Sequence, residues 1–206
     1  MPVNYFSQFR EPNGAGFIVC PLSTLEDAFV KCPAGLGFNI EVKYPDPEEA
    51  ALENIKSHDL NVFVSRILDI VFKHASGRPL IFSSFHPEAC HLLLQKQNVY
   101  PVFYLTDGLV SHKKFDKRLA SVYDSMTFVK EIGCAGVVIN SLAIEQAPGI
   151  VSFIRDQGIL VGTYGTANDF DVNAREQLNQ GANAVITDKI REIRHVFSSR
   201  ANETIP

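Results

Sequence analysis

The hydrophobic positions along the chain fall into short, nearly uninterrupted runs that alternate with longer stretches of helical periodicity. A strand that is buried on both faces needs apolar side chains at almost every position, as in a parallel sheet covered by helices. The pattern therefore predicts six strands of a parallel sheet, at residues 38–44, 79–85, 101–106, 136–140, 160–164 and 184–188.

Between these runs, apolar residues recur at the spacing of one helical face. Residues 59–75 are typical of a long amphipathic helix with Asp59 as its N-cap, and a second helix begins with Pro87 at its first position. Gly158 and Gly181 stand where a C′ glycine ends a helix. The remaining helices are expected at residues 119–132, 144–157 and 172–180.

Strands and helices in alternation predict right-handed βαβ units, either in an open doubly wound sheet or in a (β/α)₈ barrel. A barrel needs eight strands, so six would make an incomplete barrel whose first two strands are missing. Residues 1–21 read as an irregular segment, and residues 22–197 as the partial barrel domain. The Ser23–Glu26 spacing predicts a capping box that opens a short helix through Cys32. Residues 198–206 read as a C-terminal tail.

Composition narrows the possible partners. The 206 residues carry a net charge of −4 with scattered basic residues, which argues against a nucleic-acid partner. No apolar stretch approaches the roughly 20 residues of a membrane span, and the N-terminus lacks the apolar run of a signal peptide. The four cysteines show no CxxC pair and no dense framework. The sequence therefore favours a cytoplasmic protein with reduced thiols, and Cys90 and Cys134 read as buried small hydrophobic residues.

Polar residues gather at the predicted carboxyl ends of the strands, where parallel α/β folds form their sites. Glu41 and Lys43 are two residues apart, so their side chains share one face of the first strand. Two interpretations stay open: a buried ion pair, or a carboxylate for a hard divalent cation beside an ammonium group for a phosphate.

Other polar residues at the strand ends allow more than one interpretation. His86 could act as an acid or base, but a loop histidine or an N-cap is the more frequent role. Tyr164 could form an aromatic wall or simply pack. Gly162 and Gly165 flank Tyr164 outside any GxGxxG context, which weakens a dinucleotide-binding interpretation.

Three stretches resemble the eukaryotic glycerophosphodiester phosphodiesterases, in the order that the family shows. They are TLEDAFVKCPAGLGFNIEVKYP, PLIFSSFHPEACHLLLQKQNVYPVFYLTDG and GILVGTYGTANDFDVNAREQLNQGANAVITDKI, within residues 22–192. The chain is particularly similar to the branch of glycerophosphocholine phosphodiesterases. The resemblance implies an incomplete TIM barrel of the phospholipase-C-like phosphodiesterase type, with six of its eight strands.

The resemblance also implies a reaction and a set of site residues. The reaction is hydrolysis of a glycerophosphodiester, a small-molecule substrate, to glycerol 3-phosphate and an alcohol with the help of Mg²⁺ or Ca²⁺. Glu41 matches a metal carboxylate and Lys43 a phosphate contact, while Ser84, Phe85 and Tyr164 match the substrate-binding lining. The family's catalytic histidines and its other metal carboxylates have no counterpart, so no catalytic residue is assigned.

Three hypotheses follow for the function. The first is a partial chain of an active phosphodiesterase, with little or no activity of its own because the catalytic residues are missing. The second is a non-catalytic module that binds or senses a phosphate-bearing ligand through Lys43. The third is an unrelated enzyme with an open flavodoxin-like or Rossmann-like sheet. The open barrel edges at residues 38–44 and 184–188 also predict self-association.

Overall fold

The computed structural model describes residues 6–10, 17–108, 116, 118 and 121–201. The chain divides into two compact units, one made of Met1–Phe38 with Ser65–Pro79 and the other of Asn39–Val64 with Leu80–Pro206. The larger unit carries the sheet and every site residue that the sequence predicts.

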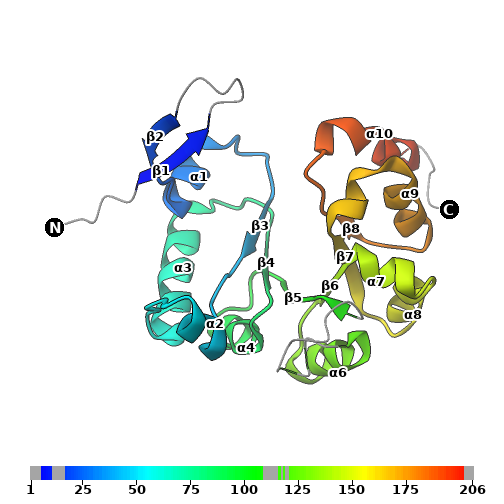
Figure 1. Ribbon diagram of the computed structural model, residues 1–206, viewed down its shortest axis with the longest axis horizontal. Coiled ribbons are helices and arrows are strands. Elements are labelled where there is room, and N and C mark those ends of the chain that lie inside the picture. Colours follow the sequence, from blue (N-terminus) through cyan, green and yellow to red (C-terminus); the bar gives the residue numbers. More distant parts are fainter. Residues whose placement is uncertain (1–5, 11–16, 109–115, 117, 119–120, 202–206) are drawn as a thin grey trace. The chain divides into compact units, whose positions relative to one another are not determined.

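The larger unit is built on a parallel sheet whose strands follow one another in chain order, β3-β4-β5-β6-β7-β8 (Figure 1). The strands form a half-barrel, so the prediction of six strands in an incomplete barrel is confirmed. Their bounds are Phe38–Glu41, Leu80–Ser84, Val102–Thr106, Gly136–Asn140, Leu160–Tyr164 and Ala184–Val185.

Helices cover the outer side of this half-barrel, each beside the strands it connects. Helix α4 (Pro87–Lys96) packs on β4 and β5, α6 (Val122–Ile132) on β5 and β6, and α8 (Ile150–Asp156) on β7. The core lies between the two layers, where the ring of fully buried Tyr104 meets that of Phe128 at 4.9 Å. The other helices are α2 (Pro47–Leu52), α7 (Ser141–Gln146), the 3₁₀ turn η2 (Thr166–Asp169), α9 (Asp171–Asn179) and α10 (Ile190–Ala201).

Local sequence signals account for where several helices begin and end. The Asp59 carboxylate accepts a hydrogen bond from the Val62 amide at 3.1 Å and so caps helix α3 (Leu60–His74) as predicted. Gly158 and Gly181 have φ values of 77° and 99°, which confirms them as the left-handed residues that end their helices. No helix in the described part of the chain combines the length and the apolar character needed to cross a membrane.

The expected helix over residues 144–157 is two helices in the structure, α7 and α8. Ala147 precedes Pro148, whose ring disfavours the helical conformation of the residue before it, and Ala147 has φ −135° and ψ 78°. At the C-terminus α10 continues through Ala201. The first residues of the predicted tail are therefore helical, whereas residues 202–206 lie outside the described part.

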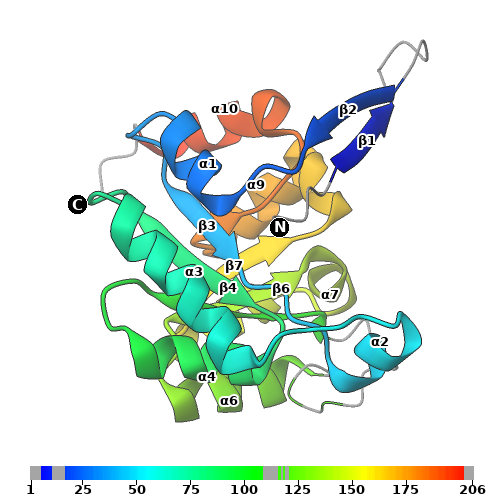
Figure 2. The ribbon, with the colours of Figure 1, turned by 90° about the vertical axis from the view of Figure 1, so that its left-hand side faces the viewer.

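The smaller unit begins with an antiparallel hairpin of β1 (Phe6–Arg10) and β2 (Phe17–Pro21), drawn in blue in Figure 2. The prediction of an irregular segment over residues 1–21 is wrong for these two strands. The two strands pair from Phe6 opposite Pro21 to Arg10 opposite Phe17. This pairing satisfies their backbone N–H and C=O groups, so the strands form without the apolar periodicity that the sequence lacks.

Helix α1 (Leu25–Lys31) follows the hairpin and begins with a capping box, one residue later than predicted. Thr24 and Asp27 form it, in place of Ser23 and Glu26. The Thr24 hydroxyl accepts from the Asp27 amide at 3.0 Å, and the Asp27 carboxylate accepts from the Thr24 amide at 2.9 Å. The shorter aspartate side chain completes the same reciprocal pair.

Arg78 organises the loop that follows α1. Arg78 is 7% exposed, and its guanidinium donates to the carbonyl oxygens of Pro33 at 2.6 Å and Cys32 at 3.2 Å. It also lies over the Phe38 ring, 4.4 Å from the centroid. Carbonyl partners and a ring face together compensate for burying this charge, so the loop conformation depends on one side chain.

Replacing Arg78 with methionine keeps the apolar contacts of the side chain and leaves the loop carbonyls without their donor. We expect Arg78→Met to lower the free energy of unfolding by about 2 to 4 kcal/mol, measured by urea denaturation. Arg66, exposed on α3, is the matched control, and Arg66→Met should change that energy by less than about 0.5 kcal/mol. Equal effects of the two substitutions would contradict this role of Arg78.

Candidate functional site

Glu41 and Lys43 project from the end of β3 on the same side of the strand, as the sequence predicts. The Lys43 ammonium lies 3.7 Å from the Glu41 carboxylate, and the two side chains are 79% and 36% exposed respectively. Val42, between them, points the other way and is 1% exposed. The ion pair is therefore not buried, and an exposed pair of this kind adds little to stability. Both charges are accessible to a ligand.

An open groove of about 450 Å³ lies beside this pair. It is lined by Glu41 at the end of β3 and Lys43 two residues later, by Glu49 of α2, and by Phe85 and His86, which follow β4. Because β3 and β4 are neighbouring parallel strands, their carboxyl ends deliver these side chains to one edge of the sheet.

Ser84 holds the two strand ends together from beneath. Its hydroxyl donates to the Val42 carbonyl at 2.6 Å and accepts from the His86 amide at 3.1 Å. Ser84 is 0% exposed, so both interactions are shielded from water. The sequence predicted Ser84 as a substrate contact, whereas the structure places it under the groove, where it positions the residues on either side.

Tyr164, at the end of β7, brings the opposite side of the half-barrel to the site. Its ring meets the Phe85 ring edge-on at 5.7 Å, and its hydroxyl donates to the Asp107 carboxylate at 2.5 Å. Burial raises the pKa of Tyr164, and the negative charges of Asp107 and Glu41 add to that shift. The phenol therefore stays protonated, and the Glu41 charge acts on the same side of the sheet as Tyr164.

Asp107 and Asn140 extend the site beyond the predicted residues. Asp107 follows β5 and accepts from the Tyr164 phenol, and Asn140 ends β6, where its side chain opposes the rise in the pKa of Tyr164. A signal for both residues was present in the sequence, since each stands at the carboxyl end of a predicted strand. What it lacked was the pairing across β5, β6 and β7 that brings them to one ring.

His86 is the N-cap of α4, the more frequent of the roles considered for it. Its Nδ1 accepts from the Ala89 amide at 3.3 Å, which requires a neutral ring with the proton on Nε2. Burial lowers the pKa of His86, although the Glu88 carboxylate opposes that shift. The Nδ1 atom lies 3.5 Å from Glu88, but the neutral ring makes this a polar contact and not an ion pair. A capped Nδ1 is not free to accept a proton.

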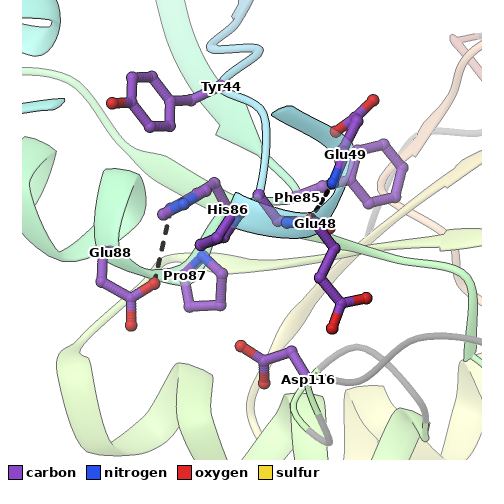
Figure 3. A pocket seen from close by; sticks show the side chains of 10 residues that line it. Tyr44, Glu48, Glu49, Phe85, His86, Pro87, Glu88 and Asp116 are labelled. Atoms are coloured by element: carbon purple, nitrogen blue, oxygen red, sulfur yellow. Dashed lines mark hydrogen bonds and ion pairs between the residues drawn. The ribbon is translucent and has the colours of Figure 1, made fainter. Parts of the chain in front are cut away.

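A second cavity of about 330 Å³ adjoins the groove and shares its walls Tyr44, Glu49, Phe85 and His86 (Figure 3). Carboxylates dominate the rest of its lining, which includes Asp46, Glu48, Glu88 and Asp116. Arg118 binds two of these carboxylates, those of Glu88 at 2.8 Å and Asp116 at 2.6 Å. The remaining acidic side chains and the two aromatic rings favour a small cationic group.

A divalent cation needs six or more oxygen ligands, usually with more than one carboxylate. Within the part of the chain that the structure describes, no three His, Cys, Asp or Glu side chains are grouped to hold a metal ion. Glu41 meets Lys43 instead of a second carboxylate. These residues on their own do not fit a complete cation site.

Comparisons with known proteins show which family this chain matches. The model of the glycerophosphoryl diester phosphodiesterase family matches residues 4–192. A glycerophosphocholine phosphodiesterase, GDE1 of Candida albicans, is 38% identical over 88% of this chain, and the glycerophosphodiester phosphodiesterase GDPD3 of Arabidopsis thaliana is 35% identical over 87%. The matches cover 16% of the Candida protein and 47% of the Arabidopsis protein, so the chain spans a minor part of these relatives.

Solved structures show the same fold. A phosphodiesterase of Oleispira antarctica, in complex with its product sn-glycerol-3-phosphate, aligns with a TM-score of 0.63 and 19% identity, over 89% of this chain and 62% of that one. A Silicibacter pomeroyi protein described as a glycerophosphoryl diester phosphodiesterase aligns with a TM-score of 0.66 and 18% identity, over 90% and 58%.

The fold and the polar strand ends thus define a partial barrel of the phosphodiesterase class. The family match over most of the residues then makes the assignment specific: this chain belongs to the glycerophosphoryl diester phosphodiesterase family. The hypothesis of an unrelated enzyme with an open Rossmann-like or flavodoxin-like sheet is wrong.

The buried Ser84 hydroxyl should contribute more to the free energy of unfolding than the hydroxyl of Ser83, its neighbour in β4. We expect Ser84→Ala to lower the free energy of unfolding by about 1 to 3 kcal/mol, because the Val42 carbonyl and the His86 amide both lose a shielded partner. Amide NMR resonances of Lys43 and His86 should shift as well.

Ser83→Ala is the matched control. Ser83 is equally buried, but its hydroxyl donates to the exposed Asn39 side chain, which water can satisfy instead. We expect a loss below about 1 kcal/mol and unchanged Lys43 and His86 resonances. Identical spectra for the two variants around Lys43 would show that Ser84 does not position the strand end.

The cap on α4 should make stability depend on pH. Because the pKa of His86 is lowered in the folded chain below its ordinary value of 6.5, the stabilisation is present above that value. It is lost as the pH falls through the folded-state pKa. We expect the free energy of unfolding to fall between about pH 7.5 and about pH 5 more in the wild type than in His86→Asn, which keeps a cap without titrating.

His91→Asn, on the exposed side of the same helix, serves as the control for removing one histidine. This variant should retain the pH dependence of the wild type. If His86→Asn and the wild type lose the same stability on acidification, the neutral imidazole is not the group responsible.

Proposed function

We propose that this chain supplies the substrate-binding part of a glycerophosphodiester phosphodiesterase, which converts a glycerophosphodiester to glycerol 3-phosphate and an alcohol. The observation that supports this most is the exposed Lys43 ammonium beside Glu41, at the carboxyl edge of a phosphodiesterase-type barrel. In the proposed role, Lys43 binds the phosphate and Glu41 is one ligand of a divalent cation, Mg²⁺ or Ca²⁺. When bound, that cation would polarise the phosphoryl oxygens.

The aromatic residues give the substrate a wall to lie against. Phe85 and Tyr164 form a T-shaped pair next to the Lys43 side of the groove, and the Asp107 carboxylate holds the Tyr164 hydroxyl. We assign to this pair the glycerol part of the substrate. Ser84, in the same proposal, acts through Val42 and His86 and makes no substrate contact of its own.

For the alcohol we propose a cationic group such as choline. The acidic cavity adjoins the groove, and the rings of Tyr44 and Phe85 stand in its wall together with Glu48 and Glu49. A quaternary ammonium there would meet ring faces and carboxylates while the phosphate reaches Lys43. The names of the fungal relatives, glycerophosphocholine phosphodiesterases, point to the same alcohol.

Proton transfer is not assigned to a residue of the groove. His86 lines it, but its Nδ1 accepts the Ala89 amide and its Nε2 carries the proton. We therefore infer that the chain by itself releases choline from glycerophosphocholine slowly at most, even with Mg²⁺ or Ca²⁺. A cytoplasmic location, which the scattered cysteines favour, belongs to the same proposal.

Ligand binding by the purified chain tests the site directly. By titration calorimetry with glycerol 3-phosphate, Lys43→Met should weaken binding about five- to tenfold, because a charge-assisted contact to phosphate is lost from an exposed position. Lys73→Met, at an exposed lysine of α3 away from the groove lining, should leave the affinity unchanged. Equal affinity of wild type and Lys43→Met would refute the phosphate assignment.

Titration calorimetry with two diesters tests the choline assignment. Glycerophosphocholine should bind more tightly than glycerophosphoglycerol, and the double substitution Glu48→Gln with Glu49→Gln should remove the difference while leaving glycerol 3-phosphate binding intact. A preference that survives the double substitution would place the ammonium group elsewhere.

A further inference from the structure

Two cysteines that take no part in the proposed function, Cys90 and Cys134, lie near each other on the helix-covered face of the sheet. Cys90 belongs to α4 and is 0% exposed. Its thiol donates to the Ser84 carbonyl at 3.6 Å and lies 3.9 Å from the Phe103 carbonyl. Cys90 thus contacts, from the helix, the last residue of β4 and the second residue of β5.

Cys134 arrives at the same place from the loop between α6 and β6. The next residue, Ala135, donates its amide to the Val102 carbonyl at 2.8 Å, and Gly136 pairs with Phe103 in the sheet. Cys134 therefore enters beside the part of β5 that the Cys90 thiol touches. The neighbouring Cys134 thiol, together with burial, raises the pKa of Cys90. Cys134 is half-buried and so has some contact with solvent.

We propose that Cys90 and Cys134 form a reversible disulfide and that Cys134 is the site of first attack by a low-molecular-weight disulfide. The Cys134 thiolate attacks one sulfur of glutathione disulfide, which forms a mixed disulfide and releases one glutathione thiolate. The sulfur of Cys90 then displaces the second glutathione from Cys134, and the Cys90 proton leaves with that glutathione as its thiol proton. Two protein thiols are oxidised and one glutathione disulfide is reduced to two thiols.

Position in the fold favours this order of events. Cys90 is closed to a reagent the size of glutathione, and its raised pKa makes it a poor first nucleophile. Once Cys134 carries a glutathionyl group, the adjacent Cys90 needs no access to solvent to react. The disulfide also removes the S–H that donates to the Ser84 carbonyl, so oxidation would act on the residue that joins the ends of β3 and β4.

Peptide mapping of the oxidised chain tests the proposal without any assay of activity. The reduced 206-residue protein is incubated with glutathione disulfide, quenched in acid, and digested with trypsin without reductant. Each thiol lies in a separate tryptic peptide, residues 74–96 for Cys90 and residues 131–155 for Cys134, and each peptide contains one cysteine. We expect a cross-linked pair of these two peptides, which disappears on adding dithiothreitol.

Single cysteine substitutions show which thiols form the cross-link. Cys32→Ser, which removes the half-buried thiol of the smaller unit, should leave the cross-link at the wild-type yield. Cys134→Ala should abolish the cross-link and leave Cys90 unmodified, whereas Cys90→Ser should leave one glutathionyl group on Cys134. The wild type and Cys134→Ala decide the question if Cys90→Ser does not fold. Glutathione on Cys134 without the cross-link, or cross-links to Cys20 or Cys32 instead, would overturn the proposal.

Discussion

The hydroxyl of Ser84 is the constraint on which the arrangement of the site depends. It is held in the core between the Val42 carbonyl and the His86 amide, so it joins the end of β3 to the turn that follows β4. Lys43 lies directly after Val42, and Phe85 lies directly before His86. This buried hydroxyl, together with the backbone bond from the Val42 amide to the Ser83 carbonyl at 2.7 Å, therefore fixes the distance between the charged and the aromatic side of the groove.

The electrostatics of the site follow from unequal burial of its charged and polar groups. The Glu41–Lys43 pair is exposed, so its charges cost little to maintain and stay available to a ligand. Tyr164 is more enclosed, and the carboxylate charges near it keep its phenol protonated as a hydrogen-bond donor. His86 is also partly buried, and its neutral ring accepts a hydrogen bond from the Ala89 amide at the start of α4. The groove thus presents the exposed Lys43 ammonium beside the Glu41 carboxylate, and the neutral ring of His86 in its wall.

Sequence alone predicted the six strands because each is a nearly continuous apolar run, and it placed Glu41 and Lys43 on one face because strand side chains alternate. It failed at the β1–β2 hairpin, which backbone pairing specifies, and at the break before Pro148, which one local clash creates in an otherwise helical pattern. The Asp107–Tyr164 bond joins residues 57 apart in the chain, and no local pattern encodes such a contact.

The carboxyl end of the half-barrel sheet and its helix-covered face are stabilised differently. The residues proposed to bind a ligand are therefore different from those that form the core. At the carboxyl end the Glu41–Lys43 pair is exposed beside a groove, and the Tyr164 phenol donates to the Asp107 carboxylate. On the helix-covered side, buried contacts such as Tyr104 with Phe128 hold α6 on β5. Cys90 is the residue that touches both, since its thiol lies in the core and bonds to the Ser84 carbonyl. A chemical change at that sulfur would therefore act directly on Ser84, the residue that joins the strand ends beside the groove.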